Sequence, residues 1–142
     1  MCWFGKDSDI HIAKEDIKCK KVLMKDKLSH KLYAPFRCTN YEIGNTYHQP
    51  FSPEELKPKE FGNYEGNVSI NIGIHCYTHD KKMFQSELGK KRLYAGLAYY
   101  EPSRNFTPVI VECIIPKDTH YCENAEGEIV TEKLVIIKEC SL

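Results

Sequence analysis

Residues 67–79, NVSINIGIHCYTH, form the most regular pattern in the chain. Apolar side chains occupy every second position from Val68 onward: Val68, Ile70, Ile72, Ile74 and Cys76. Successive side chains of a β-strand point to opposite faces of a sheet, so this spacing is typical of a strand with one buried face. We therefore predict one strand here, with His75 and Tyr77 on the face opposite the isoleucines.

A second alternating segment, DIKCKKVLMK, begins at Asp16 and also predicts a strand. Its side chains fall into two sets, with Ile17, Cys19 and Leu23 on one face and Lys18, Lys20 and Val22 on the other. Residues 31–39 and 41–48 are rich in Tyr, Phe and Thr, which favour strands, and Gly44-Asn45 predicts a bend between or within them.

The C-terminal third of the chain predicts more strands. Residues 107–115, TPVIVECII, are apolar on both faces, which is typical of a central strand. A short extended piece at 120–122 is followed by a turn at 123–128 that contains Gly127. Residues 128–140 predict either a last pair of strands or one bent strand.

Helical spacing is clearest in one segment. In residues 80–88, DKKMFQSEL, the apolar side chains of Met83, Phe84 and Leu88 lie on one helical stripe, and Gly89 is suited to the C′ position. Residues 91–102, KRLYAGLAYYEP, fit a strand or a second short helix, and their tyrosines favour the strand. Residues 50–66 contain three prolines and two glycines and predict a loop, in which a single helical turn could start at Ser52.

These elements predict an α+β fold for one domain over residues 1–142. We expect a curved, mostly antiparallel sheet of five to seven strands with one or two helices packed on it, and a Pro/Gly-rich loop at about 50–66. A length of 142 residues is typical of one domain and is enough to bury a core without metals or disulfides.

Charge argues against one class of partner. The chain has 20 Lys and Arg and 20 Asp and Glu residues, so it lacks the basic surplus that extended nucleic-acid binding needs. Lysines do cluster at 18–27 and at 81–92, which leaves a local site for a small anion open. The apolar runs are only a few residues long, so we expect no membrane span.

The seven cysteines, an odd number without any C-x-x-C pair, indicate free thiols in a reducing compartment. The chain does not open with the pattern of a secretory signal, and we expect a cytoplasmic protein. Cys38 and Cys122 are the two candidates for an exposed, reactive thiol, since Cys19, Cys76 and Cys113 occupy apolar positions of their strands.

The best candidate site is GIHCYTHD, residues 73–80, where the predicted strand meets the predicted helix. His75 and Tyr77 share a face, Gly73 leaves space beside His75, and His79 follows. A histidine in such a place can donate to a phosphate or act as a general base, although it can equally be a structural residue satisfied by a backbone carbonyl. His75 and Cys76 point to opposite faces, and no ligand set converges, so we expect neither a metal site nor a cofactor.

Four motifs in order resemble a set of small uncharacterised proteins from gut anaerobes and their phages. The motifs are YEIGNTY at 41–47, GIH at 73–75, IPKDTHY at 115–121 and EIV at 128–130, and the resemblance spans about residues 10–138. It implies no particular activity, but it suggests an accessory protein of a phage or mobile element.

A more distant likeness is to ADP-ribosyltransferase folds, in which a His or Arg on a strand, an aromatic residue and a Glu surround nicotinamide dinucleotide. That likeness implies a ligand site made of His75, Tyr94 or Tyr99, and Glu128, although the usual Ser-Thr-Ser and Tyr-His-Gly contexts are absent. The candidate ligand-binding residues are then His75, Tyr77, His79, Tyr94, Tyr99 and Glu128.

No G-x-S-x-G, G-x-x-x-x-G-K-[ST] or G-x-G-x-x-G motif occurs, so the sequence favours binding over catalysis. We expect an interaction module that binds a partner protein or a small anionic ligand. The alternative is an enzyme or sequesterer that handles nucleotides.

Overall fold

The structure of the protein is a computed structural model of the 142-residue chain. It describes residues 3–34, 39–54, 56–57, 59–61, 64–81, 84, 86 and 106–140. These residues form thirteen β-strands and one 3₁₀ turn: β1 (Trp3–Lys6), η1 (Asp7–Asp9), β2 (Ile10–Ile12), β3 (Ile17–Asp26), β4 (Leu32–Tyr33), β5 (Asn40–Tyr41), β6 (Thr46–His48), β7 (Lys59–Phe61), β8 (Tyr64–Ile70), β9 (Ile74–Thr78), β10 (Phe106–Ile115), β11 (His120–Glu123), β12 (Glu128–Thr131) and β13 (Lys133–Glu139).

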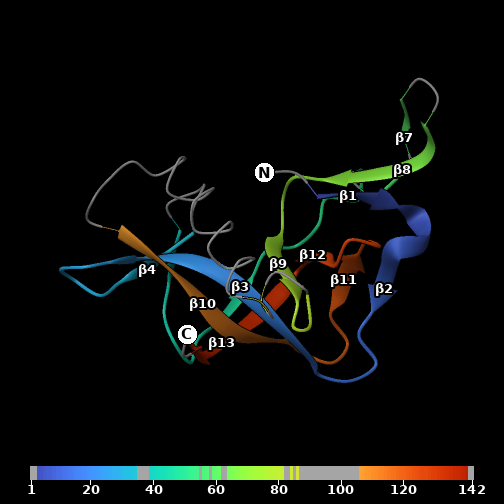
Figure 1. Ribbon diagram of the computed structural model, residues 1–142. Helices are drawn as coiled ribbons and strands as arrows, with labels where there is room; N and C mark the ends of the chain where they lie inside the picture. The colour runs from blue at the N-terminus through green and yellow to red at the C-terminus, as the bar shows by residue number, and fades with distance from the viewer. Residues whose placement is uncertain are drawn as a thin grey trace.

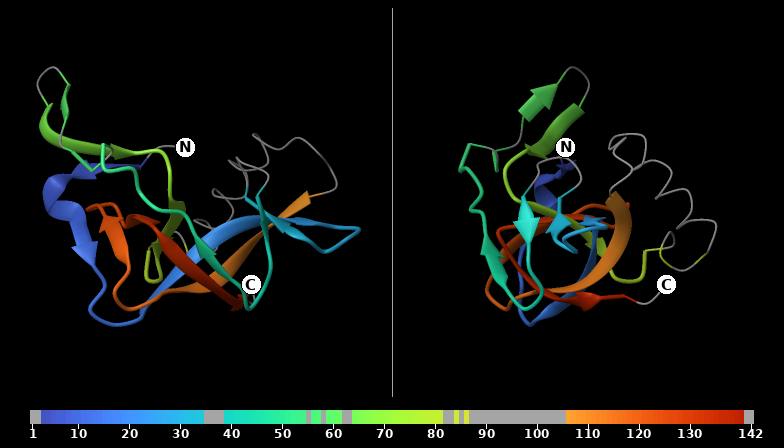
Figure 2. Two further views of the ribbon diagram at one scale, coloured as in Figure 1. Left: turned by 180° about the vertical axis from the view of Figure 1, so that it is seen from behind. Right: turned by 90° about the vertical axis from the view of Figure 1, so that its left-hand side faces the viewer.

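The strands make two antiparallel sheets, shown in Figure 1. A three-stranded sheet has the order β1-β8-β7. A ten-stranded sheet has the order β2-β11-β12-β9-β3-β10-β13-β6; in addition, β4 pairs with β3, and β5 pairs with β4. The larger sheet is strongly curved, as the two views of Figure 2 show.

The predicted α+β class is wrong. Within the described residues the only complete helical element is the three-residue turn η1, apart from the single 3₁₀ residue Phe84, and the number of strands exceeds the five to seven expected. Several strands, such as β4, β5 and β6, have only two or three residues, which is too short to produce a periodic pattern. The predicted helix at 80–88 and the segment at 91–102 fall mostly or wholly outside the described residues.

The predicted single strand at 67–79 is instead two strands in different sheets. β8 belongs to the small sheet and β9 to the large one, and residues 71–73 between them form a bend in which Gly73 has a φ of 138°. The alternation continues across the bend because the even-numbered side chains are the buried ones in both strands: Val68 and Ile70 in β8, and Ile74 and Cys76 in β9. Ile72 in the bend is the exception, with 43% of its surface exposed.

The main core lies inside the curve of the large sheet. Strands from across the sheet contribute fully buried side chains, among them Cys19, Leu23, Ile74, Cys76, Val111, Cys113, Ile115, Ile129, Leu134 and Ile136. Aliphatic contacts between strands that are not neighbours require the sheet to roll up, and burial of these side chains is the main source of its stability.

A second cluster joins the two sheets. Trp3, Val68 and Ile70 come from the small sheet, and they pack against Cys122 and Val130 of the large sheet and against Phe51. The indole Nε1 of Trp3 donates a hydrogen bond to the backbone oxygen of Glu128 at 2.9 Å. The small sheet is therefore anchored by its apolar face.

The strand predictions for the C-terminal third are largely confirmed. β10 lies between β3 and β13, as expected for a central strand, but β13 covers only Val111–Ile114. The backbone oxygen of Ile110 accepts from Cys140 N, so residues 108 and 110 direct their backbone groups away from β3. Pro108 precedes the stretch that β13 covers, so its missing N–H leaves no gap in the ladder. Residues 128–140 form two strands, and these pair with different neighbours rather than with each other.

The expected loop at 50–66 is partly strand. Residues 59–61 form β7, and β8 begins at Tyr64, so the last part of the loop is a hairpin of the small sheet. Earlier in the segment, Phe51 is buried in the second cluster, and its backbone N–H donates to Glu132 Oε1 at 2.9 Å.

Candidate functional site

The structure brings together two of the six predicted ligand-binding residues. Tyr77 on β9 and Glu128 on β12 are direct partners in the antiparallel register, so their side chains lie on the same face. His75 is paired with Val130, two residues further along both strands, and His79 lies exposed in the turn after β9. Tyr94 and Tyr99 lie outside the described residues.

His75 is half-buried and points away from the main core, as the alternation predicts. The space expected beside it at Gly73 is filled, however. A Cβ atom at Gly73 would lie 2.6 Å from Val130 Cγ2 and 2.9 Å from Phe51 Cε1. The glycine is required by close packing and by its positive φ, and the predicted opening for a ligand is absent at this point.

Tyr77 is held by packing. Its ring meets that of Phe84 edge-on at 5.8 Å, and the ammonium of Lys81 lies 4.9 Å from its centroid. Burial raises the pKa of the Tyr77 hydroxyl, and the nearby charge of Glu128 raises it further. The phenol therefore stays protonated at neutral pH and can donate a hydrogen bond, but it cannot act as a base.

Glu128 is fixed by the turn that precedes its strand. Asn124 accepts a hydrogen bond from the backbone N–H of Glu128 at 3.0 Å, and its amide donates to the Glu128 carboxylate at 3.2 Å. The same asparagine also donates to the backbone oxygen of Phe4. These contacts connect the turn, β12 and β1, which is a structural role.

Lys21 is a buried residue that the sequence reasoning missed. It lies on β3 between Cys19 and Leu23, in the phase that faces the main core, and only 7% of its surface is exposed. The available signal was the alternation itself, which puts residue 21 on the same face as residues 19 and 23. The ammonium donates to the backbone oxygen of His75 at 2.5 Å and lies 5.4 Å from the ring of Tyr41.

The surroundings of Lys21 disfavour its charge. Desolvation by burial lowers the pKa of the Lys21 amine, and three neighbouring cysteines, Cys76, Cys113 and Cys19, oppose that shift. Hydrogen bonding with Cys113 and Cys76, followed by burial, raises the pKa of the Cys19 thiol well above its usual range. The Cys19 thiol therefore stays protonated and unreactive in the folded protein.

The predicted reactive cysteines do not fit that role where the structure describes them. Cys122 is fully buried, and burial raises its pKa to about 12. Cys38 lies outside the described residues. Cys19, Cys76, Cys113, Cys122 and Cys140 are all free thiols, which agrees with the expectation for these five.

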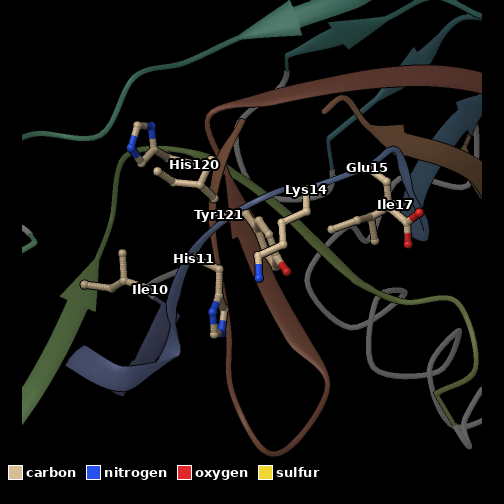
Figure 3. Close-up of a pocket in the computed structure, with 8 residues that line it drawn as sticks. Ile10, His11, Lys14, Glu15, Ile17, His120 and Tyr121 are labelled. Carbon is tan, nitrogen blue, oxygen red and sulfur yellow. The ribbon is translucent and has the colours of Figure 1, made fainter. Parts of the chain in front are cut away.

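A surface hollow of about 720 Å³ lies at the edge of the large sheet (Figure 3). Its lining comes from β2, from the segment that follows β2, from the first residue of β3, and from β11: Ile10, His11, Ile12, Lys14, Glu15, Ile17, His120 and Tyr121. None of the six predicted site residues belongs to this lining. Sequence patterns gave no indication of the hollow, because it depends on the pairing of β2 with β11, which are about 110 residues apart.

Hydrogen-bond donors surround the apolar part of the hollow. The rings of His11 and Tyr121 lie 5.4 Å apart, and Figure 3 shows the Lys14 side chain extending toward Tyr121. His120 Nδ1 lies 3.4 Å from Glu132 Oε2. The Glu15 carboxylate lies at the opposite end of the hollow from the His11 ring in Figure 3.

Glu123, the residue beyond Cys122 on β11, shares a face with Tyr121. Burial raises the pKa of the Glu123 carboxyl, whereas the nearby charge of His11 lowers it. Burial, followed by the charge of Glu123, raises the pKa of the Tyr121 hydroxyl. Tyr121 is therefore a hydrogen-bond donor at neutral pH. Donors around aliphatic side chains are typical of a binding site.

The described residues contain no group of three or more His, Cys, Asp or Glu side chains arranged to hold a metal ion. They also contain no helix that is long and apolar enough to cross a membrane.

Comparison with known proteins does not assign a function to this site. No protein-family model matches the chain, and neither a curated protein nor a solved structure is significantly similar to it.

Proposed function

We propose that the chain is a non-enzymatic binding module whose site is the hollow along β2. The observation that supports this proposal is the lining of that hollow, in which Lys14, His11, His120 and Tyr121 surround aliphatic side chains. A few donors around an apolar surface fix the orientation of a ligand without performing chemistry on it.

The ligand class follows from the lining. An ammonium, two imidazoles and a phenol can all donate hydrogen bonds, so an acceptor-rich, anionic group is the best match. This group is either a small anion or an acidic side chain of a partner protein. We place the module in the cytoplasm, because free cysteines such as the five described here are typical of a reducing compartment.

Thermal unfolding with a panel of inorganic phosphate, pyrophosphate and nucleotides tests for the small anion. A ligand at one hundred times its dissociation constant adds about 2.7 kcal/mol to stability, which raises the midpoint by several degrees. We expect the shift to be lost in Lys14→Ala and kept in Lys133→Ala, which removes an exposed lysine on β13 outside the hollow. A shift that survives Lys14→Ala would contradict this site.

The alternative is an enzyme that handles nucleotides, and one observation favours it. Tyr77 and Glu128, two residues of the predicted nucleotide site, are direct cross-strand partners. Incubation with nicotinamide dinucleotide, followed by chromatography for released nicotinamide, tests this alternative. Release by the wild type that is abolished in Glu128→Gln would support the enzyme and contradict a purely binding role.

A further inference from the structure

β2 is the edge strand of the large sheet. One side of it pairs with β11, through the partners Ile10–Cys122, His11–Tyr121 and Ile12–His120. No described strand pairs with its other side. An edge strand presents a row of backbone N–H and C=O groups that can accept a further strand.

The direction of those backbone groups follows from the neighbouring hydrogen bonds. The backbone N–H of Ala13 donates to Thr119 O at 2.9 Å, and Ala13 O accepts from the backbone N–H of Asp118 at 2.7 Å. Residues of an antiparallel strand alternate between pointing their backbone groups toward one neighbour and toward the other. Because Ala13 and His11 direct theirs toward β11, the backbone groups of Ile12 point to the open edge.

The hollow follows this edge rather than one face of the sheet. Side chains from both faces of β2 line it: Ile10 and Ile12 share a face with His120, and His11 shares the other with Tyr121. Ile12 is 55% exposed. Figure 3 shows His11, Lys14 and Tyr121 together on one side of the strand and His120 on the other. An added strand would lie in such a space, with alternate side chains on each face.

Charge distinguishes the two faces of the hollow. One face carries Lys14 beside His11 and Tyr121, and no described residue forms an ion pair with Lys14, although Glu123 lies near His11. The other face carries the exposed Ile12 and His120, whose Nδ1 already lies 3.4 Å from Glu132 Oε2. An acidic side chain on an added strand would therefore be placed beside Lys14, and an apolar one beside Ile12.

We propose that β2 binds an extended segment of a partner protein, which adds to the large sheet as a further strand. The segment alternates acidic and apolar residues, with an acidic residue at Lys14 and an apolar residue at Ile12. This inference rests on the proposed binding function and names its partner.

Two synthetic peptides test the inference, one alternating valine with glutamate and one alternating valine with lysine, both with capped ends. Binding is measured by amide chemical shifts and by fluorescence anisotropy of a labelled peptide. We expect the glutamate peptide to bind at least about tenfold more tightly than the lysine peptide, with the largest shifts at the amides of Ile10 and Ile12.

Three variants separate the backbone contribution from the charge contribution. Ile12→Pro removes an N–H on the open edge, where proline is tolerated, and we expect about tenfold weaker binding. Ile12→Val keeps the N–H and should bind within about threefold of the wild type. Lys14→Glu should reverse the preference between the two peptides. Circular dichroism checks that each variant keeps the wild-type fold.

The outcomes distinguish this inference from the function on which it rests. Equal binding of both peptides, or full binding by Ile12→Pro, would overturn the added strand. If a small anion binds and neither peptide does, the added strand is overturned and the proposed binding function is kept. A dimer seen by analytical ultracentrifugation that Ile12→Pro abolishes would identify a second copy as the occupant and overturn the partner segment.

Discussion

At the scale of single residues, Lys21 is an amine among aliphatic side chains and thiols, and its burial makes stability depend on pH. Its folded-state pKa is lowered, so the unfolded chain binds more protons between that pKa and the ordinary value near 10.4. Stability contributed by this group therefore rises with pH through that window and falls as pH drops.

We predict that wild type gains free energy of unfolding relative to Lys21→Met as pH rises from 7 to 10, by at most about 1.4 kcal/mol per pH unit. Methionine has a similar length and no charge, so the other titrating groups largely cancel in the comparison. Urea unfolding at four pH values measures the difference. Parallel pH profiles for the two proteins would show that Lys21 is not desolvated in the fold.

Gly73 allows a second prediction for a single residue. In Gly73→Ala the new Cβ would clash with Val130 and Phe51, and the φ of 138° would also be strained. We expect a loss of about 3 kcal/mol or more in the free energy of unfolding. Gly44→Ala is the matched control: its φ is 88° but nothing lies within 4 Å of the new Cβ, so we expect a loss of only about 1 kcal/mol.

The alternation of apolar and polar residues predicted which face of a strand a side chain occupies better than it predicted what that side chain does. It placed His75 on the face of β9 opposite Ile74 and Cys76, and the structure confirms this. The same alternation puts Lys21 inside, but lysine is so seldom buried that the residue was not considered. The filled space at Gly73 could not be predicted, because Phe51 and Val130 come from distant parts of the chain.

At the scale of elements, β3 has a different apolar set on each face. Cys19 and Leu23 face the main core, and Val22 and Met24 pack with Phe84 and Ile110 on the other side. The strand is therefore buried on both faces over its second half, although four lysines lie within its length.

We predict that Leu23→Ala lowers the free energy of unfolding by about 2–5 kcal/mol, because it leaves a cavity at a fully buried position. The same substitution at Leu28, in the turn after β3 and 84% exposed, should change it by at most about 0.5 kcal/mol. Chemical denaturation of the two variants side by side measures both. Comparable losses would mean that β3 does not line the core.

Elements with local signals were predictable and those without were not. The turn at Gly127 and strands β3, β10 and β11 were expected, because glycine, proline and long apolar runs mark them. The break between β8 and β9 was missed because Gly73 occupies a regular position in the alternation. Strands β4 and β6 lie within the predicted strands at 31–39 and 41–48, which their Tyr, Phe and Thr content indicated. Their short lengths were not predictable, because they depend on pairing with β3 and β13.

At the scale of the whole molecule, the arrangement of strands and the position of the hollow come from contacts between distant segments. The α+β class was predicted from the helical spacing at 80–88, a segment of which the structure describes only residues 80, 81, 84 and 86. β2 is an example of the limit: it has three residues, and only its pairing with β11 makes it the edge of the sheet.

The reactivity of the cysteine thiols depends on the whole fold, because the fold determines how deeply each thiol is buried. Four described cysteines are buried, and burial raises the pKa of Cys122 to about 12, whereas Cys140 is only partly buried. We predict that Cys140 reacts with a thiol reagent well before Cys19, Cys76, Cys113 and Cys122, whose labelling should follow unfolding. Timed labelling with peptide mass spectrometry measures the order. Labelling of the four at the rate of a free peptide thiol would contradict their burial.

The position of Trp3 has a practical consequence. It is the only tryptophan of the chain, it is 3% exposed, and it packs where the two sheets meet. Its fluorescence is therefore an intrinsic probe of how the small sheet separates from the large one. A red shift in emission that precedes the loss of far-ultraviolet ellipticity would reveal a state in which this contact has opened while the curved sheet persists.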